Sequence, residues 1–206
     1  MNVDELHFSM NGLLPVVVQH HRSGAVLMLG FANREAVEKT VASGHAWFFS
    51  RSRQRLWEKG ESSGHYLDLK ALRVDCDGDA LIYLCEPRGP TCHTGEPGCF
   101  FQGVDELPLG ETDGEAAALL FDRIRQRQAH GDASSSYVAR LLSEGLDRVA
   151  RKVGEEATEV IIAAKNADRE ELARELADLW FHTFVLLAQQ GMRPDDVWDE
   201  LRRRRH

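Results

Sequence analysis

The hydrophobic pattern of this chain changes its period once, near residue 105. Before that point, short apolar segments rich in glycine and aromatic residues alternate with turns, which is typical of strands. After it, apolar residues recur at helical spacing almost to the last residue. A chain of 206 residues has room for two domains of about 100 residues each. The pattern therefore predicts an N-terminal α+β domain, mostly β, followed by a C-terminal all-α helical bundle.

The expected elements follow from this pattern and from the turn residues. Asn33 and Gly44 are residue types that begin and end a helix, and Asp77-Gly78 predicts a hairpin. The predicted strands cover 14–19, 26–31, 46–50, 67–74 and 80–85, and the predicted helices 33–43, 115–130, 137–166, 168–190 and 195–205. The segment 105–114 combines proline, glycine and acids, as linkers do. We predict domains over residues 1–110 and 111–206.

Charge and composition limit the possible partners. The net charge is -8, so the backbone of a nucleic acid would be repelled. We interpret the arginines at 202–205 as cations favoured at a helix C-terminus. The N-terminus lacks a secretory signal pattern and the apolar runs are too short to span a bilayer, so we predict a cytoplasmic protein without membrane partners. Thiols stay reduced there, which favours metal binding over disulfides.

Five acidic residues lie at helical spacing on two successive predicted helices. They are Glu155, Glu156 and Glu159 on the first helix, and Glu175 and Asp178 on the second. If the helices pack antiparallel across a turn near residue 166, the carboxylates converge, and such a cluster suits Mg²⁺ shared with substrate phosphates. A solvated helix face is the alternative. Apolar residues interleave both groups, however, so the acids border an apolar stripe.

The spacing E-E-x-x-E (155–159) followed by E-x-x-D (175–178) resembles the signature of the all-α nucleoside-triphosphate pyrophosphohydrolases. Its setting, S-Y-V-A-R-L (136–141) and K-V-G-E-E-A-T-E-V (152–160), is similar to the phosphoribosyl-ATP pyrophosphatase branch. This resemblance implies hydrolysis between the α and β phosphates with release of pyrophosphate. Phosphoryl transfer needs positioned metals and charge neutralisation, which agrees with the acids. Lys152 is a candidate phosphate ligand or a plain surface lysine.

Three cysteines in the N-terminal part, Cys76, Cys92 and Cys99, lie in one short region, and His93 follows the second. Three thiolates would hold Zn²⁺ and leave its fourth position open for water, as catalytic zinc requires. The alternative is a closed structural site that adds Cys85, although the chain lacks the paired C-x-x-C spacing typical of such sites. His93 is a candidate proton shuttle, or else a packing or ligand-orienting residue.

Three aspartates, Asp75, Asp77 and Asp79, alternate around the first cysteine in D-C-D-G-D. They are candidate Mg²⁺ ligands. A polar hairpin tip is an equally ordinary reason for such a run. Spacing leaves the choice open, because Asp75 and Asp79 need not share a face of a tight hairpin.

Four motifs together closely resemble phosphoribosyl-AMP cyclohydrolase: F-F-S-R-S-R (48–53), L-W-E-K-G-E-S-S-G-H (56–65), D-C-D-G-D (75–79) and G-P-T-C-H-T-G-E-P-G-C-F (89–100). In that family the three cysteines bind zinc in a site built at a dimer interface, and the aspartates bind Mg²⁺. The resemblance therefore implies a homodimer whose zinc ligands come from two chains. Cys85 is not part of the motif and stays unassigned.

The two resemblances cover nearly the whole chain in the order found in the bifunctional enzymes of histidine biosynthesis. They imply that the C-terminal domain converts phosphoribosyl-ATP to phosphoribosyl-AMP. The N-terminal domain would then add water to C6 of the adenine ring and open the N1-C6 bond, with His93 assisting proton transfer. Candidate phosphate ligands are four cations and two glycine amides: Arg51, Arg53, Lys59, Arg88, Gly60 and Gly64.

Two other functions fit parts of the pattern. A zinc-stabilised scaffold whose helical half only dimerises would have no activity. A housecleaning hydrolase would turn over ordinary dNTPs as readily as phosphoribosyl-ATP. Neither explains why T-C-H-T, D-C-D-G-D and G-E-S-S-G occur together, so the bifunctional hydrolase is the favoured prediction.

Overall fold

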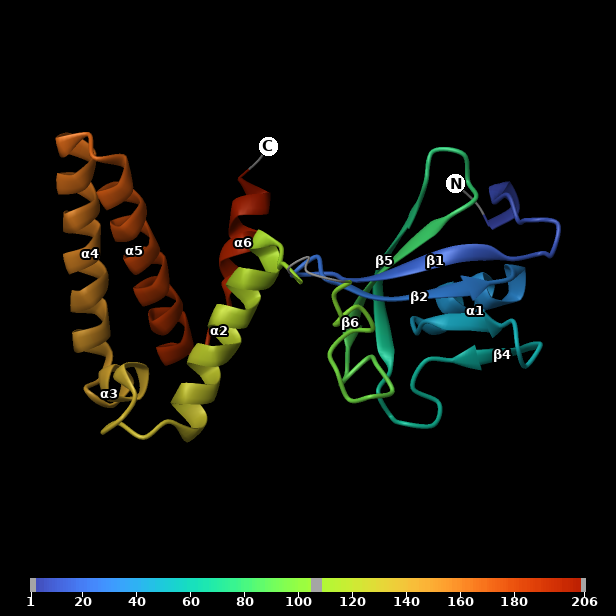
Figure 1. Cartoon of the computed structure of the whole chain (residues 1–206), viewed down its shortest axis with the longest axis horizontal. Coiled ribbons are helices and arrows are strands. Elements are labelled where there is room, and N and C mark those ends of the chain that lie inside the picture. The colour runs from blue at the N-terminus through green and yellow to red at the C-terminus, as the bar shows by residue number, and fades with distance from the viewer. Residues whose placement is uncertain (1–2, 105–108, 205–206) are drawn as a thin grey trace. The chain divides into compact units, whose positions relative to one another are not determined.

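The computed structural model describes residues 3–104 and 109–204, which form two compact units (Figure 1). The first unit, residues 1–115, contains the sheets, and the second, residues 116–206, is helical. The predicted succession of an α+β part and an all-α part is confirmed. Residues 105–108 of the predicted linker lie outside the described residues. The domain boundary at residue 110 stays a prediction.

The first unit combines a four-stranded sheet, a two-stranded sheet and one α-helix. The larger sheet has the strand order β2-β1-β6-β5, in which β1 and β6 run parallel and the other neighbours antiparallel. The smaller sheet pairs β3 with β4. The elements are the 3-10 turn η1 (Val3–Glu5), β1 (Leu14–His20), β2 (Val26–Ala32), α1 (Arg34–Ser43), β3 (Trp47–Ser50), β4 (Arg55–Glu58), β5 (Leu67–Val74) and β6 (Leu81–Pro87).

The core of this unit follows the two-residue period of its strands. Alternate residues of β1 and β6 are buried, namely Leu14, Val16, Val18, Leu81, Tyr83 and Cys85. Burial raises the pKa of the Cys85 thiol to about 12, which keeps it protonated and makes it a packing residue.

The predicted ends of α1 are confirmed. The Asn33 side chain accepts a hydrogen bond from the Ala36 amide, and Gly44 ends the helix at a φ of 72°. The sequence predicted no strand at Arg55–Glu58. This segment forms β4, which has four residues, none of them fully buried, and so carries little hydrophobic pattern.

The second unit is built on two long antiparallel helices, α4 and α5. Its elements are α2 (Asp113–His130), which begins at the end of the first unit, α3 (Tyr137–Ser143), α4 (Leu146–Asn166), α5 (Arg169–Gln189) and α6 (Pro194–Arg203). The prediction of one helix over 137–166 was wrong. Gly145 has a φ of 92°, outside the helical region, and it separates α3 from α4.

The turn predicted near residue 166 is confirmed. Ala167 adopts a left-handed conformation, and the Asp168 carboxylate accepts hydrogen bonds from the amides of Glu170 and Glu171, which begins α5. Because two residues separate the helices, α4 and α5 lie side by side in opposite directions (Figure 1). This arrangement brings the acids of both helices to the same position along the axis of the helix pair.

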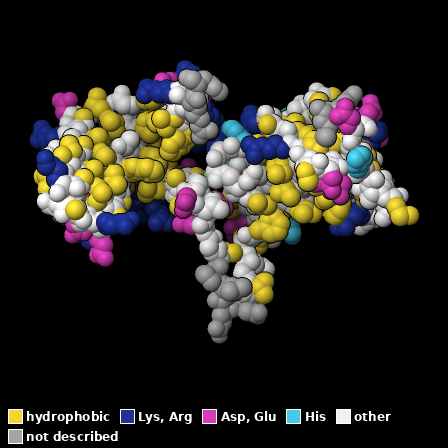
Figure 2. All heavy atoms as spheres, turned by 90° about the horizontal axis from the view of Figure 1, so that it is seen from above, with side chains coloured by type: hydrophobic (Ala, Val, Ile, Leu, Met, Phe, Trp, Pro, Cys, Tyr) yellow, Lys and Arg dark blue, Asp and Glu magenta, His cyan; other side chains and the backbone are white. Residues whose placement is uncertain are grey.

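The helical unit has a buried core and exposed apolar residues. Phe121 and Ile124 of α2 pack with Phe184 and Val185 of α5. Hydrophobic side chains also gather on its surface (Figure 2), and Trp180 is 57% exposed. Among the helices of the described residues, none has the length and apolar character needed to cross a membrane.

Candidate active sites

Two of the three predicted zinc ligands, Cys92 and Cys99, lie together in the loop that follows β6. The Cys92 amide donates to the carbonyl of Glu96 at 3.1 Å, and the Cys99 amide donates to the carbonyl of Leu27 in β2 at 2.7 Å. These bonds hold the loop so that each of the two thiols affects the pKa of the other.

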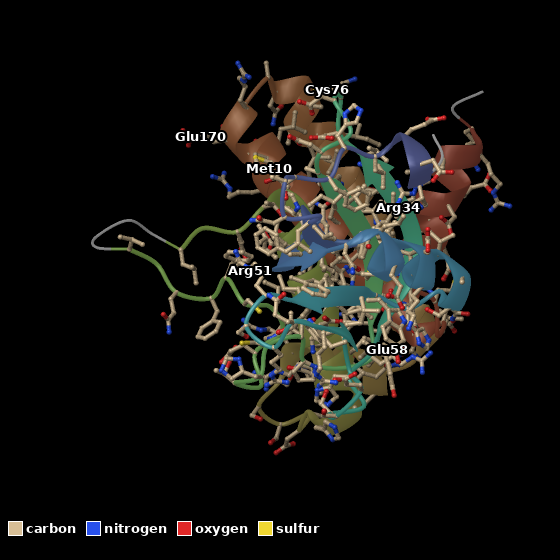
Figure 3. All side chains as sticks on the ribbon, turned by 90° about the vertical axis from the view of Figure 1, so that its right-hand side faces the viewer. Met10, Arg34, Arg51, Glu58, Cys76 and Glu170 are labelled. Carbon is tan, nitrogen blue, oxygen red and sulfur yellow. The ribbon has the colours of Figure 1, made fainter. Side chains whose placement is uncertain are left out.

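The third predicted ligand, Cys76, lies in the β5–β6 hairpin at the other end of β6. Seven residues of strand separate this hairpin from the Cys92 loop, a length of roughly 20 Å. Figure 1 shows the hairpin turn at the top of the unit and the yellow-green loop below it, and Figure 3 labels Cys76. Within the described residues, therefore, the three thiols form no group whose ligand atoms lie within 4.8 Å of one another. One chain alone does not bring them together.

The environment of the two paired thiols favours a metal ligand. The Thr94 hydroxyl donates to Cys92 Sγ at 3.1 Å, and this bond lowers the pKa of the Cys92 thiol. Burial raises the pKa of Cys99, as does the neighbouring Cys92. Burial lowers the pKa of Lys59, while the neighbouring Cys99 and Cys92 act in the opposite direction and raise it. A thiol with a lowered pKa beside a second sulfur donor fits the donor set of zinc.

His93 is exposed beside this pair. Its Nδ1 atom lies 3.8 Å from Cys92 Sγ. The imidazole therefore adjoins the thiols and is open to solvent, as a group that exchanges protons with a bound molecule must be.

The structure brings the hairpin acids together. Asp75, Asp77 and Asp79 are exposed and offer ligand atoms within 4.8 Å of one another. Asp75 Oδ1 also accepts hydrogen bonds from the amides of Asp79 and Ala80, as in an ordinary turn. A hydrogen bond that the Asp79 carboxyl donates to Asp75, together with the charge of Asp77, raises the pKa of Asp79. Converging like charges of this kind fit a divalent cation with oxygen ligands.

The glycines of the loop between β4 and β5 have distinct roles. Gly60 has a φ of 101°, and a Cβ atom there would lie 2.6 Å from the backbone nitrogen of Tyr66. Gly64 also has a positive φ, 75°, but a Cβ atom would meet no atom within 4 Å. The Gly64 amide donates to the carbonyl of Gly60 at 2.8 Å, so it is already bonded. The loop is therefore a compact turn that only glycine at 60 permits.

Replacing Gly60 by alanine is expected to displace this loop. The strained φ together with the clash should lower the free energy of unfolding by about 2–4 kcal/mol and impair phosphoribosyl-AMP hydrolysis. Gly64→Ala is the matched control, because it adds the same methyl group at a positive φ in open space and should cost about 1 kcal/mol. Urea unfolding and the kcat/KM of the hydrolysis give the comparison. Equal effects of the two substitutions would contradict this role for Gly60.

Arg51 and Arg53 line an open cavity of about 510 Å³. The Arg51 guanidinium lies 3.8 Å from the centre of the Phe31 ring, and Figure 3 labels its place in the unit. Phe48, Phe49 and Trp57 also line the cavity. Aromatic faces beside cations are suited to a nucleotide base and its phosphate.

Arg88 is held by a carboxylate of its own chain. Its Nε lies 3.0 Å from Asp68 Oδ1 and its Nη2 lies 2.9 Å from the same oxygen. This bonding to Asp68 raises the pKa of Arg88. The guanidinium also lies over the Tyr66 ring, 5.5 Å from its centre. Arg88 therefore fixes the end of the β4–β5 loop against β6.

In the helical unit the structure groups three of the five predicted acids. Glu156, Glu159 and Glu175 offer ligand atoms within 4.8 Å of one another. Glu156 is only 4% exposed. Glu155 points to Lys152, with an oxygen to Nζ distance of 2.9 Å, and Asp178 is exposed on α5. The group therefore bridges α4 and α5, as antiparallel packing predicts.

The charges of this group are only partly balanced. The charge of Glu156 raises the pKa of Glu159, and burial and Glu175 add to the effect. Lys152 Nζ lies 2.6 Å from Glu156 Oε1, and its hydrogen bonds to Glu156 and Glu155 raise its pKa. Three converging carboxylates with one adjacent cation form an oxygen donor set that fits Mg²⁺.

The sequence prediction missed two polar residues beside these acids, His182 and Tyr137. His182 is 5% exposed, its Nδ1 lies 3.6 Å from Glu156 Oε1, and its Nε2 lies 3.0 Å from the Tyr137 hydroxyl. The sequence feature that could have identified His182 is its position one turn after Asp178, within an otherwise apolar run.

Comparison with known proteins relates each unit to a different family. The phosphoribosyl-AMP cyclohydrolase model matches residues 28–101, and the phosphoribosyl-ATP pyrophosphohydrolase model matches residues 119–205. Relatives named histidine biosynthesis bifunctional protein HisIE match nearly the whole chain. The one from Deinococcus radiodurans is 50% identical over 95% of this chain and 90% of its own. This chain belongs to that bifunctional family.

Two further relatives of the same name agree. Those from Thermus thermophilus and Bacillus subtilis are each 48% identical, over 96% and 98% of this chain and 91% and 95% of their own. Membership confirms the predicted bifunctional hydrolase of histidine biosynthesis, with the cyclohydrolase before the pyrophosphohydrolase along the chain. The metal ions and the site residues stay predictions.

Proposed function

We propose that the acid group of the helical unit cleaves phosphoribosyl-ATP and that the thiol loop and hairpin of the first unit open phosphoribosyl-AMP. The observation that carries this assignment is the separate clustering of two chemically distinct donor sets. Carboxylates converge between α4 and α5, whereas thiols and aspartates lie at the ends of β6. The two domains, 1–110 and 111–206, then perform successive steps on one substrate.

In the helical unit, Glu156, Glu159 and Glu175 would hold Mg²⁺, with Glu155 and Asp178 at the margin of the site. The ion supplies charge neutralisation and orientation for the phosphates. Because Lys152 binds Glu156 and Glu155, it fixes these acids and presents a cation to the triphosphate. Water then attacks one of the two phosphorus atoms that flank the bridge between the α and β phosphates. The P–O bond of that bridge breaks, and pyrophosphate leaves.

In the first unit, Cys76, Cys92 and Cys99 would hold Zn²⁺, which makes a water molecule nucleophilic near neutral pH. Water adds to C6 of the adenine ring, the N1-C6 bond breaks, and N1 gains a proton. His93 lies beside Cys92 and would accept the proton of the water and return it to N1. Asp75, Asp77 and Asp79 would bind Mg²⁺.

The phosphates of this substrate would contact cations and a backbone amide of the first unit. Arg51 and Arg53 line the open cavity, and Lys59 and the Gly60 amide lie in the β4–β5 loop. Gly64 and Arg88 contribute indirectly, since their polar groups are already bonded within the chain. The nucleotide thus lies between the cavity and the thiols.

The active form would be a homodimer. Cys76 lies at one end of β6 and the other two thiols lie at the opposite end, so a second chain must supply the missing ligand. Exposed apolar residues of α4 and α5, such as Ile161 and Trp180, are further surfaces that a second copy would cover. Zinc bound to thiolates requires reduced cysteines, which favours the cytoplasm.

Lys152→Met tests the acid group. Without this cation the nearly buried Glu156 loses its partner, so we expect the free energy of unfolding without metal to fall by about 2 kcal/mol. Mg²⁺ should restore more stability to this variant than to the parent. Urea unfolding followed by helix circular dichroism, with and without Mg²⁺, measures both effects. Lys165→Met, an exposed change at the end of α4, is the control. If Mg²⁺ stabilises neither the parent nor Lys152→Met, a metal site here is contradicted.

A further inference from the structure

His182 is a buried polar residue that the mechanism above does not use. It lies on α5, one turn beyond Asp178. Its ring contacts the Glu156 carboxylate, the Tyr137 hydroxyl and the backbone carbonyl of Asp178. We propose that His182 is a positioning residue of the pyrophosphohydrolase, which together with Tyr137 holds Glu156 in the orientation that binds the metal. This inference rests on the proposed metal site between α4 and α5.

The contacts of the ring determine which nitrogen carries the proton. Nδ1 lies 2.9 Å from the backbone carbonyl oxygen of Asp178 and 3.6 Å from Glu156 Oε1, and both oxygens are acceptors. Nδ1 must therefore carry the hydrogen, since a lone pair there would face two oxygens. In the neutral ring Nε2 is then the acceptor, and the Tyr137 hydroxyl donates to it at 3.0 Å.

This tautomer fixes one side of the Glu156 carboxylate. Lys152 Nζ approaches Oε1 at 2.6 Å and the His182 Nδ1-H faces the same oxygen. Lys152 therefore binds Oε1 from the protein side with the His182 ring beside it, while the carboxylate still offers a ligand atom within 4.8 Å of those of Glu159 and Glu175.

Tyr137 extends this support to α3. It is the first residue of α3, after the Ser136 N-cap, and its ring stacks near Phe181. The chain of contacts thus runs from α3 through α5 to the carboxylate on α4. A metal ligand held from two neighbouring helices loses little freedom when the ion binds.

A packing role alone does not account for this arrangement. His182 is 5% exposed and borders an apolar core in which a leucine would need no hydrogen-bond partner. Its three polar partners include an acid of the metal group and the backbone of Asp178, another predicted ligand. One polar atom of the ring, Nδ1, thus lies beside an acid of the metal group, and the other is held by Tyr137.

Mn²⁺ binding to the full chain tests the inference, with free Mn²⁺ measured by electron paramagnetic resonance. His182→Leu should weaken the site in the helical unit about 10-fold to 100-fold, the usual effect of removing a group that orients a metal ligand. His182→Asn, which keeps a side-chain N-H near the position of Nδ1, should recover much of the loss. Tyr137→Phe, at a partly exposed position, should weaken binding less and guards against a folding defect in the leucine variant.

Two further variants are needed to interpret the result. Thr183→Val is the matched control, because the Thr183 hydroxyl donates to the Leu179 carbonyl one turn back, away from the acids. Glu156→Gln identifies which Mn²⁺ site belongs to the helical unit. If Glu156→Gln binds as the parent does, the proposed metal site and this inference both fail. If Glu156→Gln loses the site while His182→Leu and Tyr137→Phe bind as the parent does, the positioning role alone is overturned.

Discussion

Replacing Glu156 by glutamine should abolish pyrophosphate release from phosphoribosyl-ATP while leaving the hydrolysis of phosphoribosyl-AMP unchanged. Glu156 is the most buried acid of the group, and it lies between Lys152 and the carboxylates of Glu159 and Glu175. The amide has nearly the same shape but lacks the charge that a divalent cation requires. Groups that only orient a metal ligand contribute 10-fold to 100-fold to activity, so loss of a ligand should lower kcat by more than about 100-fold.

Glu170→Gln is the matched control for this experiment. Glu170 is exposed in the first turn of α5, outside the group that Glu156 forms with its neighbours. Initial rates of pyrophosphate release and of phosphoribosyl-AMP hydrolysis should be measured for both variants. Equal losses in both reactions would indicate a folding defect, and full pyrophosphate release by Glu156→Gln would contradict the assignment of the acid group.

The second large effect concerns the three thiols. Cys76→Ala and Cys92→Ala should each abolish the hydrolysis of phosphoribosyl-AMP, yet the two variants produced together in one cell should recover part of it. The structure separates Cys76 from Cys92 by the length of β6, so in the proposed homodimer a complete site would take its ligands from two chains. In a mixed dimer one of the two sites then contains both substitutions, while the other contains none.

Random pairing of the two variants predicts the size of the recovery. Half of the dimers are mixed and half of their sites are intact, so activity should return to about a quarter of the parent value. Cys92→Ala with Cys99→Ala is the control, because these thiols lie on one loop and no mixed site would hold all three. Recovery by the control pair, or none by the first pair, would contradict a shared site.

Local geometry made much of the helical site predictable. The three-residue step between Glu156 and Glu159 fixes one face of a helix, and the turn with its N-cap at Asp168 fixes the direction of the next helix. Those two facts place Glu175 opposite the first acids, as the structure has it. Asp178 occupies the next turn and is more exposed, which spacing alone does not distinguish.

Other features of the structure could not be predicted from the hydrophobic pattern and the residue spacing. The break at Gly145 depends on one residue with a positive φ inside a continuous helical pattern. His182 and Tyr137 come from helices whose contact no periodicity specifies, so a lone histidine in an apolar run resembles an ordinary core residue. The nearness of Cys76 and Cys92 in sequence was similarly misleading, because β6 lies between them, and only the family resemblance implied a site shared by two chains.

We assign one step of a two-step hydrolysis to each unit, and the whole assignment can be tested at once. Mass spectrometry of the products formed from phosphoribosyl-ATP with Mg²⁺ and Zn²⁺ tests it most directly, using the parent chain, Cys92→Ala and Glu156→Gln. We expect pyrophosphate with the ring-opened monophosphate from the parent, accumulated phosphoribosyl-AMP from Cys92→Ala, and intact phosphoribosyl-ATP from Glu156→Gln. Ring opening by Cys92→Ala, or pyrophosphate from Glu156→Gln, would contradict the assignment.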